Sequence, residues 1–475
     1  MKQPVENEKS NKNILRITYV VVCLFLLMIG YEGYFLTFQR EDVINNPYNA
    51  RLNSLSDRIV RGQIKSSDGV VLAETVTGEN KTESRNYPYG SLYAHVVGYS
   101  SRGKTGLESY ANYYLLTSHI NLMEQVVNEF SGRKNPGDDV YTTLDHQIQQ
   151  TASDALGDRK GAVVVMEPDT GRILAMVSKP GYDPNTINLD WNNLVENPEE
   201  AWLLNRATQG LYPPGSIFKL VTLLEYVREN PEGYRDFQFD CDGIYEEGEY
   251  KIQCFHQTVH GSQNLVQAFA NSCNGAFASL GLFLDGEKTN QTAEDLLFNK
   301  EFFLPVAYNK SSFQIQDQEN TWEILQTYIG QGKTQFTPMH GAMIGAAVAN
   351  GGILMNPYLI ERVDHAGGET IKRFTPTVYG SLMTAQEAAL LSEMMRAVVT
   401  DGTGSALRNE NYTVAGKTGS AEFETGKETH AWFVGFAPVE KPELVVSVIV
   451  EEGGSGGRTA GPVARAVFDV WFGRK

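Results

Sequence analysis

The segment from Ile17 to Phe38 constrains this chain more than any other feature of its sequence. It begins with ITYVVVCLFLLMIGY, fifteen residues without a charge, and GYFLTF extends the apolar character beyond Glu32. About twenty residues of this composition are enough to cross a bilayer as a helix. A cleaved signal peptide is the alternative, but the run is long for the apolar part of a signal, and no A-x-A-like cleavage site follows it. We therefore predict an uncleaved transmembrane helix over residues 17–38.

Charged residues on either side of this segment predict its orientation. Lys2, Lys9, Lys12 and Arg16 precede it, whereas acidic residues predominate within its last turns and just after it. Basic residues favour the cytoplasmic side of a span. We expect residues 1–16 to form a cytoplasmic tail and the rest of the chain to lie on the extracytoplasmic side of the plasma membrane.

The exported part is too long for one ordinary domain and too acidic for a nucleic-acid-binding protein. A length of 475 residues favours two or more domains. The 40 basic and 57 acidic residues give a net charge of −17, the wrong sign for a surface that contacts phosphates. The character of the sequence changes near residue 150. We expect a smaller mixed domain over residues 39–150, with a helical stretch at Leu107–Leu116, and a larger domain over residues 151–475.

The larger domain has a strand pattern at both of its ends. Residues 161–184 form two apolar runs around a P-D-T-G turn, which predicts a β-hairpin. Three further strands are predicted over residues 412–423, 431–438 and 443–452, and an amphipathic helix over residues 461–472. The sequence between these groups is mainly helical in pattern. This order predicts an α+β fold, an α/β sandwich with a mostly antiparallel sheet.

A candidate nucleophile lies in YPPGSIFKL, residues 212–220. Pro-Pro-Gly cannot lie inside a helix, and apolar residues at helical spacing follow it, so Ser216 is predicted at a helix N-terminus. Lys219 then lies one turn on, on the same face. The helix N-terminus favours an oxyanion beside Ser216, and its dipole favours the neutral amine of Lys219, a plausible base. The S-x-x-K pattern alone is weak, since Ser101/Lys104 and Ser131/Lys134 also match it.

Two further motifs give this pattern weight. Ser272-Cys-Asn274 is an S-x-N motif, and Lys417-Thr418-Gly419 lies on a predicted strand. A second K-T-G copy, at Lys104, precedes a predicted helix and is interpreted as a turn. The ordered set S-x-x-K, S-x-N and K-T-G is the signature of penicillin-binding proteins and serine β-lactamases.

The chain resembles a class B penicillin-binding protein, a PbpA-like peptidoglycan D,D-transpeptidase, over nearly its whole length. The resemblance implies a pedestal (dimerisation-type) domain over residues 39–150. It also implies a transpeptidase domain of the penicillin-binding protein and serine β-lactamase type over residues 151–475, with a five-stranded antiparallel sheet and a helical subdomain. The segments that carry it are RGQIKSSDGVVLAE (61–74), TGLESYANYYL (105–115), NRATQGLYPPGSIFK (205–219), IGQGKTQFTPMHGAMIGAAVANGG (329–352) and HAWFVGFAP (430–438).

The resemblance assigns catalytic roles to five residues. Ser216 would attack the carbonyl of the penultimate D-alanine of a peptidoglycan stem peptide and expel the terminal D-alanine. Lys219 would accept the Ser216 proton, and Ser272 would relay a proton towards the leaving amine. Asn274 would hydrogen-bond the amide of the donor peptide, and Lys417 would bind its carboxylate. The acyl-enzyme would pass to an amine of a neighbouring stem.

The resemblance also implies how substrate and inhibitors bind. Thr418 would hydrogen-bond the terminal carboxylate, and Gly419 would let the stem approach the strand edge as an added strand. The backbone N–H groups of Ser216 and Ser420 would form the oxyanion hole. A β-lactam would acylate Ser216 in the same way as a stem peptide. No metal ion or cofactor is implied.

Related activities remain as alternatives. A D,D-carboxypeptidase would use the same residues but pass the acyl group to water. A class A β-lactamase needs a deacylating glutamate in an E-x-x-L-N segment, and the loose match at Glu200 precedes the nucleophile instead of following it. A β-lactam sensor would carry a multi-span metalloprotease half, whereas one span is predicted here.

Cysteine and histidine residues form a separate group. Cys241 and Cys254 are expected to face an oxidising exterior and to pair as a disulfide. Zinc binding by these cysteines with His256 and His260 is the alternative. His256-x-x-x-His260 lacks the glutamate of a zinc protease motif, and Cys273 is interpreted as a packed small residue.

The predicted domains also suggest a partner. Residues 39–150 match the pedestal motifs and are too few to hold a glycosyltransferase as well. The resemblance therefore points to a separate SEDS-type membrane glycosyltransferase, contacted through the span and the pedestal. Glu32, near the outer edge of the span, would face protein or lipid headgroups.

Overall fold

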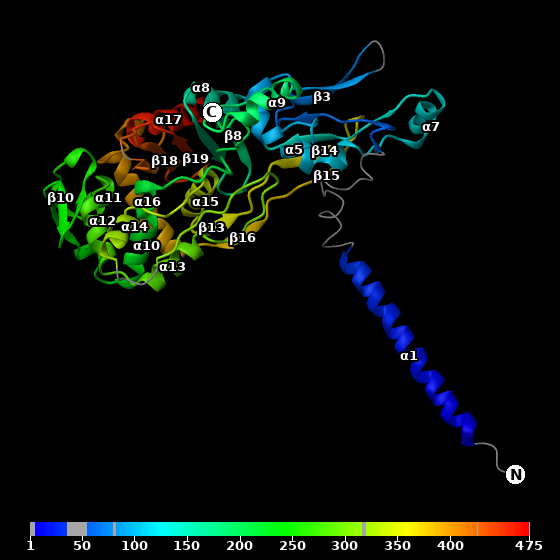
Figure 1. Cartoon of the computed structure of the whole chain (residues 1–475), viewed down its shortest axis with the longest axis horizontal. Coiled ribbons are helices and arrows are strands. Elements are labelled where there is room, and N and C mark those ends of the chain that lie inside the picture. Colours follow the sequence, from blue (N-terminus) through cyan, green and yellow to red (C-terminus); the bar gives the residue numbers. More distant parts are fainter. Residues whose placement is uncertain (1–4, 36–54, 79–81, 316–319, 425, 475) are drawn as a thin grey trace.

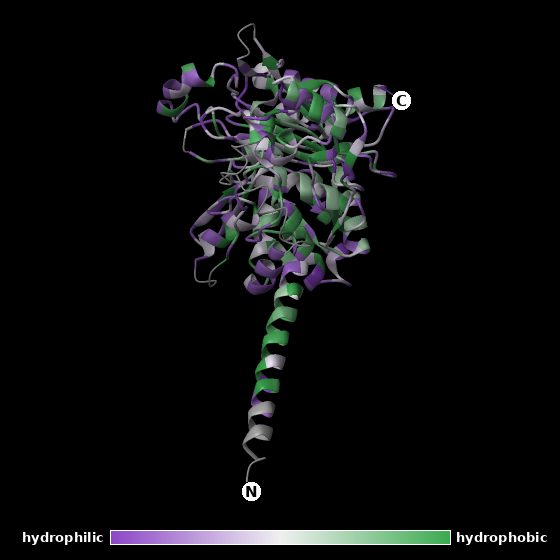
Figure 2. Cartoon of the chain, turned by 90° about the vertical axis from the view of Figure 1, so that its right-hand side faces the viewer, coloured by the Kyte–Doolittle hydropathy of each residue, from purple (hydrophilic) through white to green (hydrophobic). Residues whose placement is uncertain are grey.

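The computed structural model describes residues 5–35, 55–78, 82–315, 320–424 and 426–474. Its first element, α1 (Val5–Tyr34), is a continuous helix that stands apart from the globular part of the molecule (Figure 1). Residues Lys12–Tyr34 are apolar and long enough to cross a membrane, with a mean hydropathy of 2.2 and no burial against the rest of the chain. Figure 2 shows this apolar stretch as a nearly unbroken band along α1.

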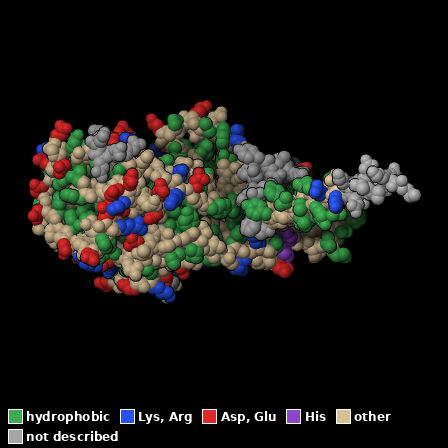
Figure 3. All heavy atoms as spheres, turned by 90° about the horizontal axis from the view of Figure 1, so that it is seen from below, with side chains coloured by type: hydrophobic (Ala, Val, Ile, Leu, Met, Phe, Trp, Pro, Cys, Tyr) green, Lys and Arg blue, Asp and Glu red, His purple; other side chains and the backbone are tan. Residues whose placement is uncertain are grey.

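The structure therefore has a candidate membrane helix where one was predicted, with two differences in its limits. Helix α1 begins at Val5, so most of the predicted tail over residues 1–16 continues the helix. The last predicted residues of the span, 36–38, lie outside the described residues. Exposed apolar side chains occupy α1 from Ile14 to Tyr34, whereas acidic and basic side chains are interspersed on the face of the globular part shown in Figure 3. This contrast is what a membrane helix attached to a water-exposed body requires.

The smaller domain is built on a six-stranded mixed sheet with the order β15-β14-β6-β2-β3-β4. Strands β14 and β15 come from beyond residue 350, and β14 pairs antiparallel with β6. The chain thus returns to complete the first sheet, and a single boundary at residue 150 does not separate the two parts. The elements are β1 (Ile59–Val60), β2 (Ile64–Lys65), β3 (Val71–Thr77), β4 (Glu83–Asn86), α4 (Ala94–Val97), α5 (Gly106–Tyr110), α6 (Asn112–Leu115), α7 (Leu122–Phe130), β5 (Asn135–Pro136), β6 (Asp139–Thr142), β14 (Ile360–Asp364) and β15 (Thr370–Arg373).

A buried ion-pair cluster joins the strands of this domain to its helices. Glu108, fully buried on α5, accepts from Arg61 Nε at 2.6 Å and from Arg85 Nε at 2.7 Å. The hydroxyl of Tyr87 lies 3.3 Å from the same carboxylate. Burial opposes ionisation of Glu108, but the two arginine charges hold its pKa below the ordinary 4.5.

The predicted helix at residues 107–116 is broken at Ala111 into α5 and α6.

The larger domain contains the predicted five-stranded antiparallel sheet, with the order β17-β18-β19-β7-β8. Strand β7 is buried on both faces: Val163 and Val165 pack against one layer of helices, and Val164 and Met166 against another. Helices α8 and α17 cover the first face, and α15 covers the second. The elements are α8 (His146–Leu156), β7 (Gly161–Met166), β8 (Ile173–Lys179), α15 (Pro338–Ala349), β17 (Ala415–Ala421), β18 (His430–Ala437), β19 (Leu444–Val450) and α17 (Gly461–Gly473).

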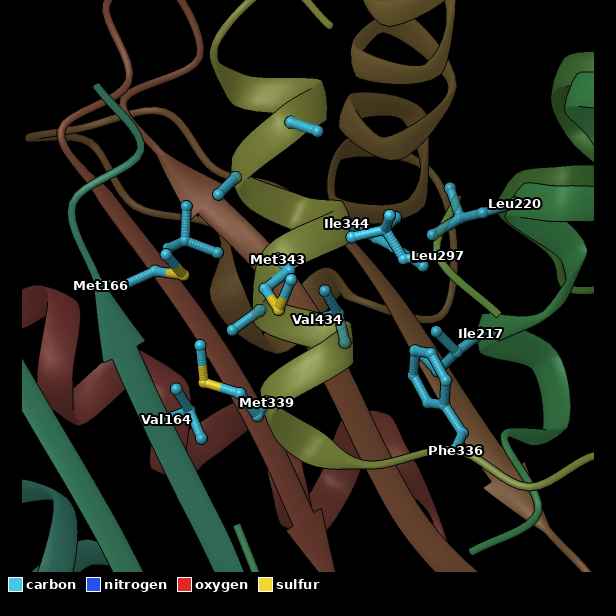
Figure 4. Close-up of a cluster of buried hydrophobic side chains, with 14 of the residues drawn as sticks. Val164, Met166, Ile217, Leu220, Leu297, Phe336, Met339, Met343, Ile344 and Val434 are labelled. Atoms are coloured by element: carbon cyan, nitrogen blue, oxygen red, sulfur yellow. The ribbon is translucent and has the colours of Figure 1, made fainter. Parts of the chain in front are cut away.

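Helix α15 connects this sheet to the helical subdomain. Figure 4 shows Met339 and Met343 of α15 directed towards the sheet, beside Val164 and Met166. Ile344 points the other way, to Leu297 and Leu220. Nearly every residue of α15 is buried. Because buried side chains are closely packed, α15 fixes the distance between the sheet and α10 (Lys219–Glu229), the helix that carries Leu220.

The helical subdomain also contains short strands that the sequence pattern did not predict. Two antiparallel pairs, β9 with β12 and β10 with β11, lie between α10 and α11. The elements are α10 (Lys219–Glu229), β9 (Gln238–Cys241), β10 (Ile244–Glu247), β11 (Tyr250–Gln253), β12 (Gly261–Asn264), α11 (Leu265–Ala270), α12 (Asn274–Gly281), α13 (Gly286–Asp295), α14 (Thr321–Tyr328) and α16 (Ala385–Thr400). Helix α9 (Ile187–Glu196) lies elsewhere, where Ile187 packs with Ala94 and Tyr99 of the smaller domain. Strands β13 (Ile353–Met355) and β16 (Val378–Ser381) pair antiparallel next to α15.

Candidate active site

Ser216 lies in a tight turn that leads directly into a helix, as its sequence predicted. The turn is a short 3-10 helix, Gly215–Ile217, and α10 follows it from Lys219. Gly215 adopts φ +52°, a conformation that residues with a Cβ rarely take. Its N–H donates to the carbonyl of Gly330 at 2.8 Å, which anchors the turn from outside. Ser216 is half-buried, so its hydroxyl can be reached by a substrate.

This turn packs against β17, the strand that carries the K-T-G motif. A Cβ on Gly215 would lie 2.9 Å from the Cβ of Ala421 and 3.0 Å from the carbonyl oxygen of Ser420. A Cβ on Gly419 would lie 3.3 Å from Ile217 Cγ1. The two glycines thus permit the close contact that places Ser216 beside Gly419 and Ser420, which are about two hundred residues away in sequence.

Three of the predicted residues meet around the hydroxyl of Ser272. Lys219 Nζ donates to the Ser272 carbonyl at 2.7 Å and lies 3.4 Å from Ser272 Oγ. Lys417 Nζ donates to the same Oγ at 2.8 Å. Lys219 also donates to Asn274 Oδ1 at 2.8 Å. Ser272 Oγ therefore lies between the two amines, positioned to pass a proton between neighbouring groups.

Both lysines are fully buried, and this decides their protonation. Neither forms an ion pair with a carboxylate in the described part of the chain. Burial lowers the pKa of Lys219 to about 8. Burial, together with the nearby charge of Lys219, lowers the pKa of Lys417 well below its ordinary value. Two adjacent buried amines disfavour a double positive charge, so one of them is available as a base near neutral pH.

Strand β17 is the edge of its sheet, so a peptide can pair with its free side. It bonds only to β18 within the five-stranded sheet. Thr418 Oγ1 lies 2.5 Å from Thr403 Oγ1, and the N–H of Gly456 donates to Ser420 Oγ at 3.3 Å. Thr403 is a site residue that the sequence analysis missed. Its only signal was a turn-like D-G-T-G segment, residues 401–404.

The structure therefore gathers all eight predicted residues at one place. Ser216, Lys219, Ser272, Asn274 and Lys417 come together with the β17 residues Thr418, Gly419 and Ser420. The other S-x-x-K matches lie in the smaller domain. Of these, Lys134 donates to Glu83 at 3.0 Å in an exposed ion pair. The first K-T-G copy precedes α5, as interpreted from sequence.

The prediction that Cys241 and Cys254 form a disulfide was wrong. The Sγ atoms of Cys241 and Cys254 are 3.7 Å apart, and both residues are free thiols. His256 is exposed in a short 3-10 turn with φ +54°, which excludes the helical H-x-x-x-H arrangement of a zinc protease. Cys273, interpreted as a packing residue, is fully buried and lies 3.7 Å from Cys254.

Models of two protein families match the chain. The penicillin binding protein transpeptidase domain matches residues 161–469, and the penicillin binding protein A dimerisation domain matches residues 61–140. The chain is 32% identical to the peptidoglycan D,D-transpeptidase PbpA of Mycolicibacterium smegmatis, over 96% of this chain and 98% of the relative. It is 30% identical to the peptidoglycan D,D-transpeptidase MrdA of Acinetobacter baumannii, over 82% of this chain and 66% of the relative.

Solved structures agree with these matches. The ceftriaxone acyl-enzyme complex of penicillin-binding protein A from Mycobacterium tuberculosis superimposes with a TM-score of 0.80 at 30% identity, covering 88% of this chain and 99% of the other. The D,D-transpeptidase domain of a peptidoglycan glycosyltransferase from Eggerthella lenta gives a TM-score of 0.78 at 36% identity, covering 87% and 99%.

Proposed function

Because the chain belongs to the penicillin-binding protein transpeptidases, we propose that it cross-links peptidoglycan stem peptides through a covalent seryl-enzyme and is acylated by β-lactams at the same serine. The observation that carries this proposal is the position of Ser272 Oγ between two buried lysines, next to the turn that holds Ser216. Relatives named D,D-transpeptidases and acyl-enzyme complexes of similar structures support it.

Acylation begins at Ser216. Its Oγ attacks the carbonyl carbon of the penultimate D-alanine, and its proton passes to the neutral amine of Lys219. A C–O bond forms as the C–N bond to the terminal D-alanine breaks, and the leaving nitrogen takes a proton through Ser272. Lys219 is buried, with a pKa of about 8, so its neutral form makes up about a tenth of the molecules at pH 7 and about half at pH 8.

The free edge of β17 positions the donor peptide. The stem lies along Gly419 as an added strand, and Asn274 holds its amide from the opposite side. Thr418, supported by Thr403, hydrogen-bonds the terminal carboxylate. Lys417 Nζ donates to Ser272 Oγ, so Lys417 takes part in the proton relay from that position. The N–H groups of Ser216 and Ser420 bind the oxyanion.

The second step distinguishes transpeptidation from hydrolysis. An amine of a neighbouring stem attacks the ester carbonyl, releases Ser216 and forms the cross-link. A D,D-carboxypeptidase would use water instead and release a shortened stem. We would incubate the full-length protein with uncross-linked glycan strands and analyse the muropeptides after digestion. Cross-linked dimers are expected, whereas shortened monomers without dimers would contradict the proposal.

We also propose that the domain over residues 39–150 is a pedestal and that the catalytic domain lies on the extracytoplasmic side of the plasma membrane. The basic residues before the apolar part of α1 support this orientation. Protease protection of intact spheroplasts tests it. The large domain should be digested from outside, and its full protection would reverse the orientation.

A SEDS-type membrane glycosyltransferase is the partner that we propose for this enzyme. Helix α1 offers an apolar surface to a membrane partner, and the pedestal offers α7. Five apolar side chains on this nine-residue helix are exposed, among them Leu122 at 78% and Phe130 at 89%. Exposed apolar groups at this density are typical of a protein contact.

The partner is tested by exchanging the two surfaces separately. One variant replaces residues 17–38 by an unrelated membrane span, and another carries Leu122→Ser with Phe130→Ser. We expect weaker co-purification with the polymerase and less glycan synthesis in reconstituted membranes, with penicillin binding retained. Undiminished recovery and synthesis in a protein carrying both changes would refute this partnership.

A further inference from the structure

Four side chains with metal-binding atoms converge behind the S-x-N motif. Cys241 ends β9, Cys254 follows β11, His260 precedes β12, and Cys273 caps α12. Their sulfur and imidazole nitrogen atoms all lie within 4.8 Å of one another. The three cysteines are 5%, 3% and 0% exposed, so the cluster is enclosed. Each ligand comes from a different element, which is why the sequence shows no C-x-x-C signal.

The distances fit the edges of a tetrahedral zinc site. Zn–S bonds of about 2.3 Å and Zn–N bonds of about 2.0 Å give edges of roughly 3.8 Å between sulfurs and 3.5 Å between sulfur and nitrogen. Here Cys254 Sγ lies 3.7 Å from both Cys241 Sγ and Cys273 Sγ. Cys241 Sγ lies 3.3 Å from His260 Nδ1. A common centre can therefore reach all four atoms with little movement.

A disulfide explains the same arrangement less well. It requires two sulfurs about 2.05 Å apart and can use only one pair. Cys254 is equally far from two cysteines, so neither pair is favoured over the other. Any disulfide would leave a third buried thiol and the imidazole without a role. A metal ion uses all four groups.

A backbone N–H group points at one of the sulfurs. Cys273 Sγ accepts from the N–H of Ala276 at 3.4 Å. Hydrogen bonds of this kind from outside the ligand set orient metal ligands and stabilise their charged form.

We propose that Cys241, Cys254, His260 and Cys273 bind one zinc ion in a structural site. Three sulfurs and one imidazole nitrogen in a closed tetrahedron form a ligand set that selects zinc over the harder cations. The site lies outside the catalytic chemistry and leaves no coordination position for water or substrate.

This ion would fix the position of the S-x-N motif. Cys273 lies between Ser272 and Asn274, the two residues that hold Lys219. The residue before Cys254, Gln253, accepts at its carbonyl from Asn274 Nδ2 at 2.8 Å. Ser272 has φ +57°, a left-handed conformation that a residue with a Cβ keeps only when the surroundings hold it. A metal bonded to the next residue provides that restraint.

Metal content tests the site independently of cross-linking activity. Full-length protein in detergent, purified without chelators, should contain one zinc per chain by mass spectrometry of the elements. Cys254→Ser and His260→Gln should each lose it. His256→Gln and Cys23→Ser are matched controls, since His256 lies outside the cluster and Cys23 lies on α1; both should retain zinc. Zinc retained in the cluster variants would overturn the assignment.

Two measurements on the wild-type chain test the proposal even if the variants fail to fold. Replacement of zinc by Co²⁺ should give the intense absorption of tetrahedral cobalt thiolates. A strong chelator should lower the melting temperature and slow acylation by a fluorescent penicillin about 10- to 100-fold, the range for groups that orient a site from behind. Added zinc should restore both. A metal-free wild-type protein with a Cys241–Cys254 disulfide in non-reducing peptide mapping would overturn the proposal.

Discussion

The substitution Lys219→Arg separates a base from a positive charge at the centre of the site. Lys219 is fully buried and donates to the Ser272 carbonyl at 2.7 Å and to Asn274 Oδ1 at 2.8 Å. Arginine can form hydrogen bonds of this kind, but its pKa above about 12 keeps it protonated. Lysine, with a pKa of about 8 here, is neutral in roughly half of the molecules at pH 8. The variant therefore removes proton acceptance while it keeps a donor.

The expected loss of acylation rate follows from the role of Lys219 as a general base. Loss of a positioned general base costs about 10²- to 10⁴-fold, or about 3–5 kcal/mol in the activation barrier. The larger side chain also costs about 1–3 kcal/mol of stability, because the site is closely packed. We would measure the second-order rate of acylation by a fluorescent penicillin and the free energy of unfolding in urea. Lys333→Arg, at an 88% exposed lysine, is the matched control and should change neither.

The pH dependence provides an independent check. Because the neutral amine is the reactive form, the wild-type rate should rise as pH increases through about 8 and then level off. The arginine variant should be slow throughout and show no such rise. If Lys219→Arg acylates within about threefold of wild type, or keeps the rise, then Lys219 acts only through its charge and another group is the base.

Three further outcomes are expected. Ser216→Ala should abolish penicillin labelling and change stability by at most about 1 kcal/mol, since only a small side chain at the start of a helix is lost. Labelling that persists would place the nucleophile elsewhere. Glu108→Gln should lower the free energy of unfolding by about 3–5 kcal/mol at pH 7, because buried arginine charges lose their partner. The pKa of Glu108 is lowered in the folded state, so its contribution to stability is present above pH 4.5 and is lost as pH falls through the folded pKa. If urea titrations show the same loss of stability in acid for the variant and the wild type, Glu108 does not have this role. Thr403→Val should slow acylation by a penicillin, whose carboxylate Thr418 would bind, about fivefold, equivalent to about 1 kcal/mol. An unchanged rate would show that the hydrogen bond from Thr403 is not needed to position Thr418.

Local patterns in the sequence were sufficient to predict the helices and strands whose apolar residues form a regular pattern. The apolar run predicted α1, and the five strands were predicted near their observed limits because each is a short apolar segment bounded by turn residues. The Pro-Pro-Gly turn placed Ser216 at a helix start, since proline and glycine restrict the backbone locally. The three motifs, in order, contain seven of the eight site residues, and the family resemblance added Ser420.

Contacts between distant segments decided the rest. Strands β14 and β15 join the first sheet because β14 pairs with β6 and β15 pairs with β14, a choice that no local pattern encodes. Thr403 reaches Thr418 through the packing of α16 against β17. The cysteine pairing was wrong for the same reason: spacing in sequence suggested two partners, whereas the fold brings Cys273 and His260 to the same point. The sequence by itself determined which groups the protein has and where its helices and strands form, because those depend on neighbours along the chain. The tertiary structure alone decided which groups meet and how strongly burial lowers the pKa values of the two lysines, because long-range packing sets both.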